Sequence, residues 1–176
     1  MAPEERSRRD AGLTVIPRRE SPRRSRCPRI ADMSYEPTAT ELKQLIDDYI
    51  DQWNEPDTAR RHALIRRVWA VDGVQVLVNP PREIRDGAAM YGIAHPPLVV
   101  QGHDAFDARV DRAYEMFVEP GYVFERSSEP VRQPGAAVTF SWVMRNRADG
   151  TVAGAGLEVL TFAEDGRIRT DHQYVG

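Results

Sequence analysis

Glu158, His172 and Tyr174 are the residues of this chain whose types and spacing best suit acid–base chemistry. Glu158 interrupts an apolar run near the end of the chain, and the other two residues lie in the run that follows. Burial raises the pKa of a carboxyl group, whereas a histidine beside it lowers that pKa. Such a pair can act as general acid and general base near neutral pH if both side chains face one pocket.

The direction of these side chains depends on the turn between the two runs, which we interpret as strands. Residues 164–166 end in an Asp-Gly pair, which permits a two-residue or a three-residue turn. The choice reverses the face of every side chain in the second strand. The three-residue turn pairs Phe162 with Ile168 and gathers the apolar residues on one face. It also pairs Glu158 with His172, so we prefer the register in which the three candidate residues share a face.

The preceding hairpin supplies aromatic neighbours for the glutamate. A turn at residues 148–150 sets Phe140 opposite Glu158. It also sets Trp142 opposite Gly156, and a large ring facing a residue without a side chain leaves room for a ligand or a close helix. Three interpretations of the glutamate follow: catalysis, ligand contact without chemistry, or a structural pair that only fixes the register or faces outward.

Three helices are expected to cover this sheet. Apolar residues recur at helical spacing over residues 42–53, 64–69 and 106–117, and the first of these stretches follows a capping box. Trp53 and Tyr114 are the aromatic residues of these helices best placed to reach a cavity. The arginines of the second and third helices, Arg66, Arg67, Arg109 and Arg112, are expected on solvated faces.

The segment between the second and third helices is the least regular part of the chain. Residues 74–78 are predicted to form a strand, and residues 79–101 a long loop with one helical turn near Glu83–Met90. Long loops in compact domains are often lids or binding loops. The order is then helix, helix, strand, loop, helix and a meander of about four strands, which predicts an α+β fold with a curved, mainly antiparallel sheet.

Residues 1–37 are predicted to be a disordered tail, and residues 38–176 the single domain. The first 32 residues hold nine arginines, four prolines and few apolar residues, so they cannot form a core. They are either a tail or sequence upstream of a start at Met33. An arginine-rich arm can contact nucleic acid, but acidic residues outnumber basic ones in the rest of the chain, which argues against a nucleic-acid-binding protein.

Several classes of function find no support in the sequence. No apolar run approaches the roughly 18–20 residues that cross a bilayer, so no membrane insertion is expected. Cys27 is the single cysteine and can form no internal disulfide, which suits a cytoplasmic location. The four histidines show no paired metal-binding spacing, and "GAGLE" is not a dinucleotide-binding motif. We therefore expect no metal and no cofactor.

Three segments carry a resemblance to a known family. Residues 63–80, 102–114 and 156–176 resemble the SnoaL-like branch of the nuclear transport factor 2-like superfamily. The resemblance implies a cone-shaped fold in which the sheet wraps around the helices and encloses a deep apolar pocket. It also implies a homodimer formed through the convex face of the sheet. Members of this superfamily include isomerases, dehydratases, epoxide hydrolases, polyketide cyclases and binding proteins without catalytic activity, so the fold alone does not decide the function.

The resemblance also suggests roles for single residues. Glu158 matches the acid that many SnoaL-like proteins carry in the penultimate strand, and His172 lies in the last strand, where pocket residues are common. Asn79 lies where ketosteroid isomerases carry their proton-shuttling aspartate. An asparagine takes up no proton, which argues against steroid isomerisation of the usual kind, and the Asp–Arg–Asp arrangement of limonene epoxide hydrolases is not recovered.

These observations together predict a pocket for a small apolar molecule, such as a polyketide or terpenoid. The predicted enzyme is a cofactor-independent cyclase, isomerase or dehydratase in which Glu158 is the base. Either His172 or Tyr174 would then donate a hydrogen bond to the developing oxyanion. The alternative is a non-catalytic, dimeric binding module with the same pocket.

Overall fold

The computed structural model describes residues 37–176. The helix α1 (Ala39–Asn54) begins at the predicted capping box, in which Thr38 and Glu41 each bond to the other's backbone N–H. The helix α2 (Thr58–Val68) is capped by Asp57. The helix α4 (His103–Ala113) continues into a π-helical turn, η1 (Tyr114–Val118). No helix in the described part of the chain is long and apolar enough to cross a membrane.

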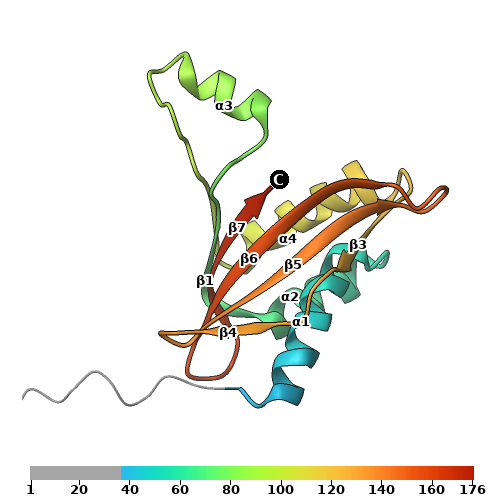
Figure 1. Ribbon diagram of the computed structural model, residues 1–176, viewed down its shortest axis with the longest axis vertical. Coiled ribbons are helices and arrows are strands. Elements are labelled where there is room, and N and C mark those ends of the chain that lie inside the picture. The colour runs from blue at the N-terminus through green and yellow to red at the C-terminus, as the bar shows by residue number, and fades with distance from the viewer. Residues whose placement is uncertain (1–36) are drawn as a thin grey trace, which may run out of the picture. The chain divides into compact units, whose positions relative to one another are not determined.

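One seven-stranded sheet follows the order β2-β1-β7-β6-β5-β3, with β4 also paired to β5. All neighbouring strands are antiparallel except β1 and β7, which are parallel. The predicted α+β class with a mixed sheet is therefore confirmed (Figure 1). The strands are β1 (Trp69–Leu77), β2 (Leu98–Gln101), β3 (Tyr122–Arg126), β4 (Val131–Gln133), β5 (Ala137–Asn146), β6 (Val152–Phe162) and β7 (Ile168–Val175).

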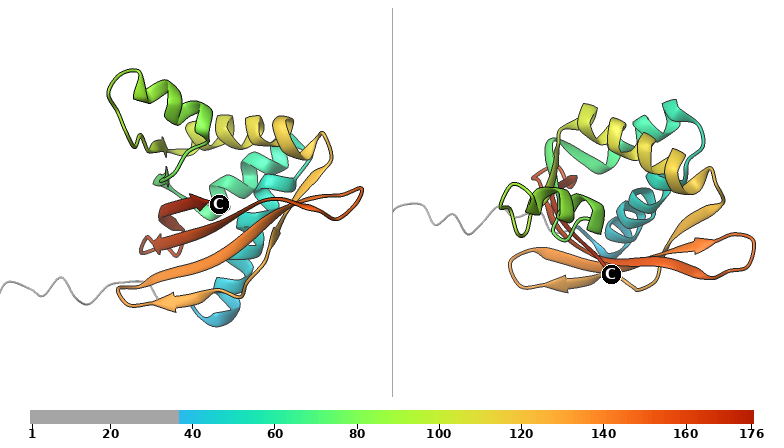
Figure 2. Two further views of the ribbon diagram at one scale, coloured as in Figure 1. Left: turned by 45° about the horizontal axis from the view of Figure 1, so that its top comes forward. Right: turned by 90° about the horizontal axis from the view of Figure 1, so that it is seen from above.

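The helices α1, α2 and α4 lie on one side of the curved sheet, and the core fills the space between the two layers (Figure 2). Aromatic rings form much of this core. Trp69 stacks on Phe106 with ring centroids 3.9 Å apart, and Tyr49 meets Phe140 edge to face at 5.5 Å. All four side chains are almost fully buried, and their packing fixes the helices on the sheet. One of them, Tyr49, also lines a pocket beside the core.

Three segments differ from the sequence prediction. The second helix ends at Val68, and Trp69 has extended backbone angles and begins β1. Residues 79–101 contain the predicted short helix, α3 (Arg82–Ala89), but also an unpredicted strand, β2, which pairs with β1. The helix α3 lies beyond the ends of these two strands (Figure 1). The short strand β4 was not predicted either, because its three residues are all exposed and carry no alternating pattern.

The hairpin of β6 and β7 begins as predicted and then departs from the predicted register. Gly166 has φ +83°, and the N–H of Ala163 donates to the carbonyl of Arg167, as the three-residue turn requires. Phe162 pairs with Ile168, as predicted, but the next pair is Thr161 with Thr170. One residue is therefore extra in β7, and this β-bulge reverses the faces of all the residues that follow.

The bulge overturns the predicted positions of His172 and Tyr174. Glu158 pairs with Gln173, whereas His172 pairs with Val159. His172 and Tyr174 consequently lie on the outer, exposed face of the sheet, and Tyr174 is 42% exposed. Asp171 and Gln173 point inward in their place. The parallel neighbour β1 is irregular at the same level, between Trp69 and Val74, so the two strands bend together.

The hairpin of β5 and β6 has the predicted register. Phe140 pairs with Glu158, and Trp142 pairs with Gly156. The space over Gly156 holds no ligand or helix, however, because the indole of Trp142 fills it. A Cβ at position 156 would lie 2.5 Å from that ring. Residues 1–36, which include Met33, Cys27 and the arginine-rich arm, lie outside the described residues, so the prediction of a tail stays a prediction.

Candidate functional site

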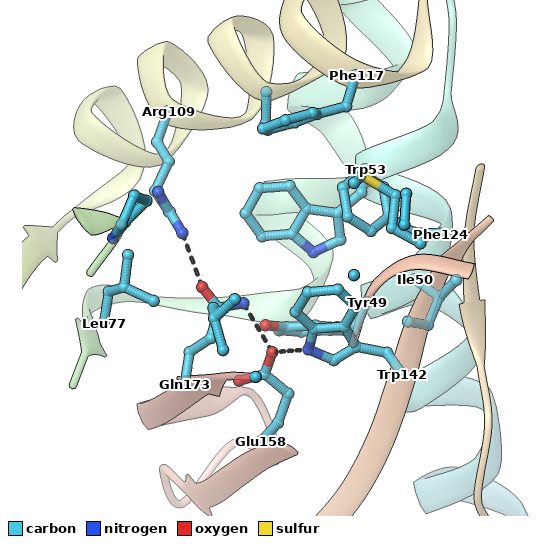
Figure 3. A pocket seen from close by; sticks show the side chains of 17 residues that line it. Tyr49, Ile50, Trp53, Leu77, Arg109, Phe117, Phe124, Trp142, Glu158 and Gln173 are labelled. Carbon is cyan, nitrogen blue, oxygen red and sulfur yellow. Dashed lines mark hydrogen bonds between the residues drawn. The ribbon is translucent and has the colours of Figure 1, made fainter. Parts of the chain in front are cut away.

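A pocket of about 270 Å³ lies between the helices and the inner face of the sheet. Most of its lining is apolar or aromatic, and the polar groups gather at one end (Figure 3). The turn η1 helps to shape it, since Ala113 precedes the π-helical turn and Phe117 lies within it, and both side chains line the pocket. Single π-helical turns are frequent at functional sites. The polar lining residues are Tyr49, Arg109, Trp142, Glu158 and Gln173.

Glu158 is fully buried at the polar end of this pocket. Its Oε1 accepts two hydrogen bonds, from Nε1 of Trp142 at 2.6 Å and from Nε2 of Gln173 at 2.7 Å (Figure 3). Its Oε2 receives no hydrogen bond from the described residues. One oxygen of Glu158 thus accepts two hydrogen bonds, and the other meets no donor. This is the arrangement expected for a protonated acid, whose hydroxyl group is itself a donor.

Asp171 is the acceptor that this arrangement requires. It is a diagonal neighbour of Glu158 on the inner face of the sheet, and its proximity raises the pKa of Glu158. Its Oδ2 accepts hydrogen bonds from the hydroxyl of Tyr49 and from Nε2 of Gln75, both at 2.8 Å. Its Oδ1 receives none from the described residues. One proton held between Oε2 of Glu158 and Oδ1 of Asp171 satisfies both oxygens.

Burial and mutual repulsion explain why the pair keeps this proton. Burial raises the pKa of Glu158 well above its ordinary value, and the charge of Asp171 raises it further. Burial also raises the pKa of Asp171, but hydrogen bonds from Glu158, Gln75 and Tyr49 oppose the increase. Burial and the charge of Asp171 therefore favour the protonated form of Glu158, while the hydrogen bonds to Asp171 favour its ionised form.

Arg109 joins the two carboxyl groups indirectly through a pair of glutamines. Its Nη2 donates to Oε1 of Gln173 at 2.8 Å, and its Nε donates to Oε1 of Gln75 at 2.7 Å. Each glutamine accepts from Arg109 and donates to one of the acids, so hydrogen bonds run from Glu158 through Gln173, Arg109 and Gln75 to Asp171. A proton shared between the two acids would close these bonds into a ring. With one shared proton the ring holds one positive and one negative charge, which makes its burial tolerable.

No family model matches the sequence, and no curated protein matches it either. Solved structures do match the fold. A candidate isomerase of the SnoaL-like family from Agrobacterium tumefaciens strain C58 is 24% identical, with a TM-score of 0.60 over 78% of this chain and 98% of that one. A SnoaL-like protein of unknown function from Burkholderia thailandensis E264 is 19% identical, with a TM-score of 0.53 over 80% of this chain and 99% of that one.

A third structure, a candidate polyketide cyclase from Sinorhizobium meliloti, is 18% identical, with a TM-score of 0.50 over 77% of this chain and 98% of that one. The chain has the SnoaL-like fold. Since every identity is below 25%, the likeness establishes the fold alone, and function must be argued from the site.

In this SnoaL-like domain, three of the predicted site residues lie at the pocket: Glu158, Trp142 and Trp53. Their roles stay predictions. The other five predicted residues do not line the pocket. His172 and Tyr174 lie on the outer face of the sheet. Phe140 is 1% exposed and belongs to the core against Tyr49.

Tyr114 and Asn79 were expected at the pocket, and the structure places both elsewhere. The guanidinium of Arg61 lies over the ring of Tyr114, 4.6 Å from its centroid, because Tyr114 is one residue past Ala113 and faces α2 instead of the sheet. Asn79 is exposed, and its side-chain amide bonds to the backbone of Val175 in both directions. It secures the end of β7 beside the end of β1.

The sequence analysis missed Asp171, Gln173, Gln75, Tyr49 and Arg109. Arg109 was expected on a solvated face, but its guanidinium is largely covered, and burial lowers its pKa. A signal for it existed, since Arg109 lies three residues after Phe106 and four before Ala113, on the buried stripe of α4. Asp171 and Gln173 carried no such signal, because the bulge that turns them inward is not visible in the sequence. In the described part of the chain, no three His, Cys, Asp or Glu residues form a group that could hold a metal ion.

Proposed function

We propose that this protein binds a small, largely apolar molecule in the pocket and moves a proton on it without a cofactor, as an isomerase, cyclase or dehydratase does. A polyketide-like or terpenoid-like compound suits the apolar walls. The observation that carries the proposal is the buried carboxyl group of Glu158, which lines an otherwise largely apolar pocket and has a second buried acid, Asp171, as its diagonal neighbour. Groups with pKa values this far from normal are characteristic of functional sites. Isomerase and polyketide cyclase, the activities suggested for the Agrobacterium and Sinorhizobium proteins, are consistent with this class of chemistry.

The pair allows Glu158 to accept a proton although it is already protonated. A ligand C–H group takes the place of one donor at Oε1 of Glu158 and transfers its proton there, while the proton on Oε2 passes to Oδ1 of Asp171. The electron pair of the broken C–H bond stays on the ligand as an enolate. Return of the proton from Glu158 to another carbon of the ligand completes an isomerisation. In a cyclisation the enolate carbon attacks a second carbonyl of the ligand, and the oxygen of that carbonyl takes the proton back from Glu158.

A second candidate function, ligand binding without catalysis, is favoured by one specific observation. Glu158 has no exposed surface, and Trp142 and Gln173 already occupy its Oε1. Chemistry therefore requires that a ligand displace one of these donors. If neither moves, the ring of hydrogen bonds is a rigid floor for a bound molecule.

Exchange with heavy water separates the two candidates. The protein is incubated in heavy water with a small-molecule extract, and the retained compounds are analysed by mass spectrometry. Catalysis predicts deuterium in the retained compound or its product with the parent protein, and none with Glu158→Gln. Glu164→Gln, the same change in the exposed turn, is the matched control. If the parent protein retained a compound that is unchanged and carries no deuterium, catalysis would be excluded and ligand binding without catalysis would remain.

We further propose a homodimer formed through the outer face of the sheet, as the resemblance implies. This face carries Leu157, which is 39% exposed, and Tyr174 beside it. Apolar and aromatic residues grouped on an exposed sheet face are typical of an interface.

A further inference from the structure

Arg109 has more hydrogen-bond donors than the protein uses. A guanidinium carries five N–H groups. The described residues accept two of them, at Nε by Gln75 and at Nη2 by Gln173. The group nevertheless lines the pocket, and Figure 3 shows it reaching from α4 toward the floor. The remaining N–H groups are therefore available to a molecule in the pocket.

The charge of Arg109 has no direct partner either. Among the side chains that the structure describes, no carboxylate forms a salt bridge with Arg109. Other arginines of α2 and α4 do form salt bridges with carboxylates. The nearest negative charge in its network is Asp171, which it reaches only through Gln75. The charge of Arg109 is therefore balanced only through a neutral amide, and a bound anion would pair with it directly.

The surroundings of Arg109 indicate what kind of molecule would carry such an anionic group. The guanidinium lies over the ring of Trp53, 5.4 Å from the centroid, which leaves the planar group fixed and its edge free. Leu77, Ala113 and Phe117 provide apolar walls nearby. A free inorganic anion would find no other polar partner on these walls. An apolar molecule with one acidic group would pair with the guanidinium and also pack against the apolar walls.

We propose that the ligand is an apolar carboxylic acid, and that Arg109 binds its carboxylate. This inference rests on the proposed function, whose ligand class it narrows from any small apolar molecule to one with an anionic group. Arginine suits the role because its fixed fork of donors matches the two oxygens of a carboxylate. The carboxylate anchored at Arg109 would orient the apolar body toward Trp142 and Glu158.

Two probes of equal size test the charge alone. β-Naphthoate and methyl β-naphthyl ketone differ in that a carboxylate oxygen replaces a methyl group, and each is titrated into the full-length protein by calorimetry. We expect the parent to bind the naphthoate at least about tenfold more tightly than the ketone, the size expected of charge-assisted hydrogen bonds. Arg109→Gln should reduce this ratio to about one or below, and Arg109→Lys should restore part of it. The matched control is Arg112→Gln on the same helix, whose exposed side chain pairs with Glu115.

The possible results separate this proposal from the one on which it rests. Equal binding of the two probes by the parent, or an unchanged ratio in Arg109→Gln, would overturn the role of Arg109 and leave the pocket and its acid pair untouched. Binding of neither probe would count against both proposals. The heavy-water experiment tests the catalytic proposal separately, so an absence of exchange in the parent protein would leave the preference for the naphthoate in place.

Discussion

Glu158 on β6 and Asp171 on β7 are diagonal neighbours on the inner face of the sheet, and both side chains are fully buried. Each carboxyl group has one oxygen that receives no hydrogen bond from the described residues. Two buried carboxylates cannot both ionise at close range, so one keeps its proton. This pair sets the expectations below.

The pair predicts how stability depends on pH. The pKa of Glu158 is raised in the folded protein above its ordinary value of 4.5, so the folded state holds a proton that the unfolded chain loses. The free energy of unfolding therefore falls as the pH rises above about 4.5, until the folded-state pKa is reached. Glu158→Gln should remove most of this decline, because its amide can donate to Asp171 in place of the acid proton. Denaturant unfolding between about pH 5 and pH 7 measures the effect.

The control for this measurement is Glu164→Gln in the exposed turn of the same hairpin. Its curve should run parallel to that of the parent. If Glu158→Gln lost stability at neutral pH and kept the parent's slope, Glu158 would be ionised in the folded protein.

The hydrogen-bond ring predicts a stability cost when one member is removed. Gln75→Leu deprives Nε of Arg109 of its acceptor and Oδ2 of Asp171 of one donor. Leaving buried polar groups without partners costs about 1–3 kcal/mol each. Gln101→Leu, on the exposed edge strand β2, should cost less than about 0.5 kcal/mol. Equal effects of the two substitutions in chemical denaturation would show that the ring contributes nothing to folding.

The contact between Gly156 and Trp142 predicts a local effect on the pocket. Gly156→Ala places a Cβ 2.5 Å from the indole ring, so Trp142 must move off its place at the pocket floor. We expect a loss of about 1–3 kcal/mol in stability and weaker binding of any pocket ligand. Gly154→Ala is the matched control in the same strand, since its Cβ would lie 3.6 Å from Met144. An unfolding curve of Gly156→Ala that coincides with that of the parent would refute the tight contact.

The proposed dimer predicts a concentration-dependent mass. Light scattering coupled to size-exclusion chromatography should give twice the chain mass for the parent. Leu157→Arg introduces a charge on the outer face of β6 and should yield monomers with an intact pocket. A monomeric parent at all concentrations would remove the dimer from the account.

The sequence was sufficient to predict what depends on local patterns. The apolar spacing of residues 42–53 and the capping box at Thr38 predict α1, and the turn at residues 148–150 predicts that Phe140 pairs with Glu158. These features are set within a few residues along the chain. The resemblance of the last segment to SnoaL-like proteins also led to the fold that the solved structures support.

The remaining site residues depend on a feature with no sequence pattern. In β7, Ile168, Thr170, His172 and Tyr174 alternate with residues that are just as mixed in polarity, so hydrophobicity alone does not select the inner face. The extra residue that selects it is accommodated by the parallel strand β1, more than 90 positions earlier in the sequence. The proposed acid pair therefore could not be identified before Asp171 was seen on the inside. The expected cytoplasmic location and the tail over residues 1–37 stay predictions.

The protonation state of Glu158 is measured most directly by carbon NMR of protein that contains isotope-labelled glutamate, with Glu158→Gln to assign the signal. We expect the Cδ carbon of Glu158 to keep the chemical shift of a neutral acid at neutral pH, while the exposed glutamates give the shift of carboxylates. A Glu158 signal with the chemical shift of an ionised carboxylate at neutral pH would contradict the raised pKa of Glu158 and the chemistry proposed from it.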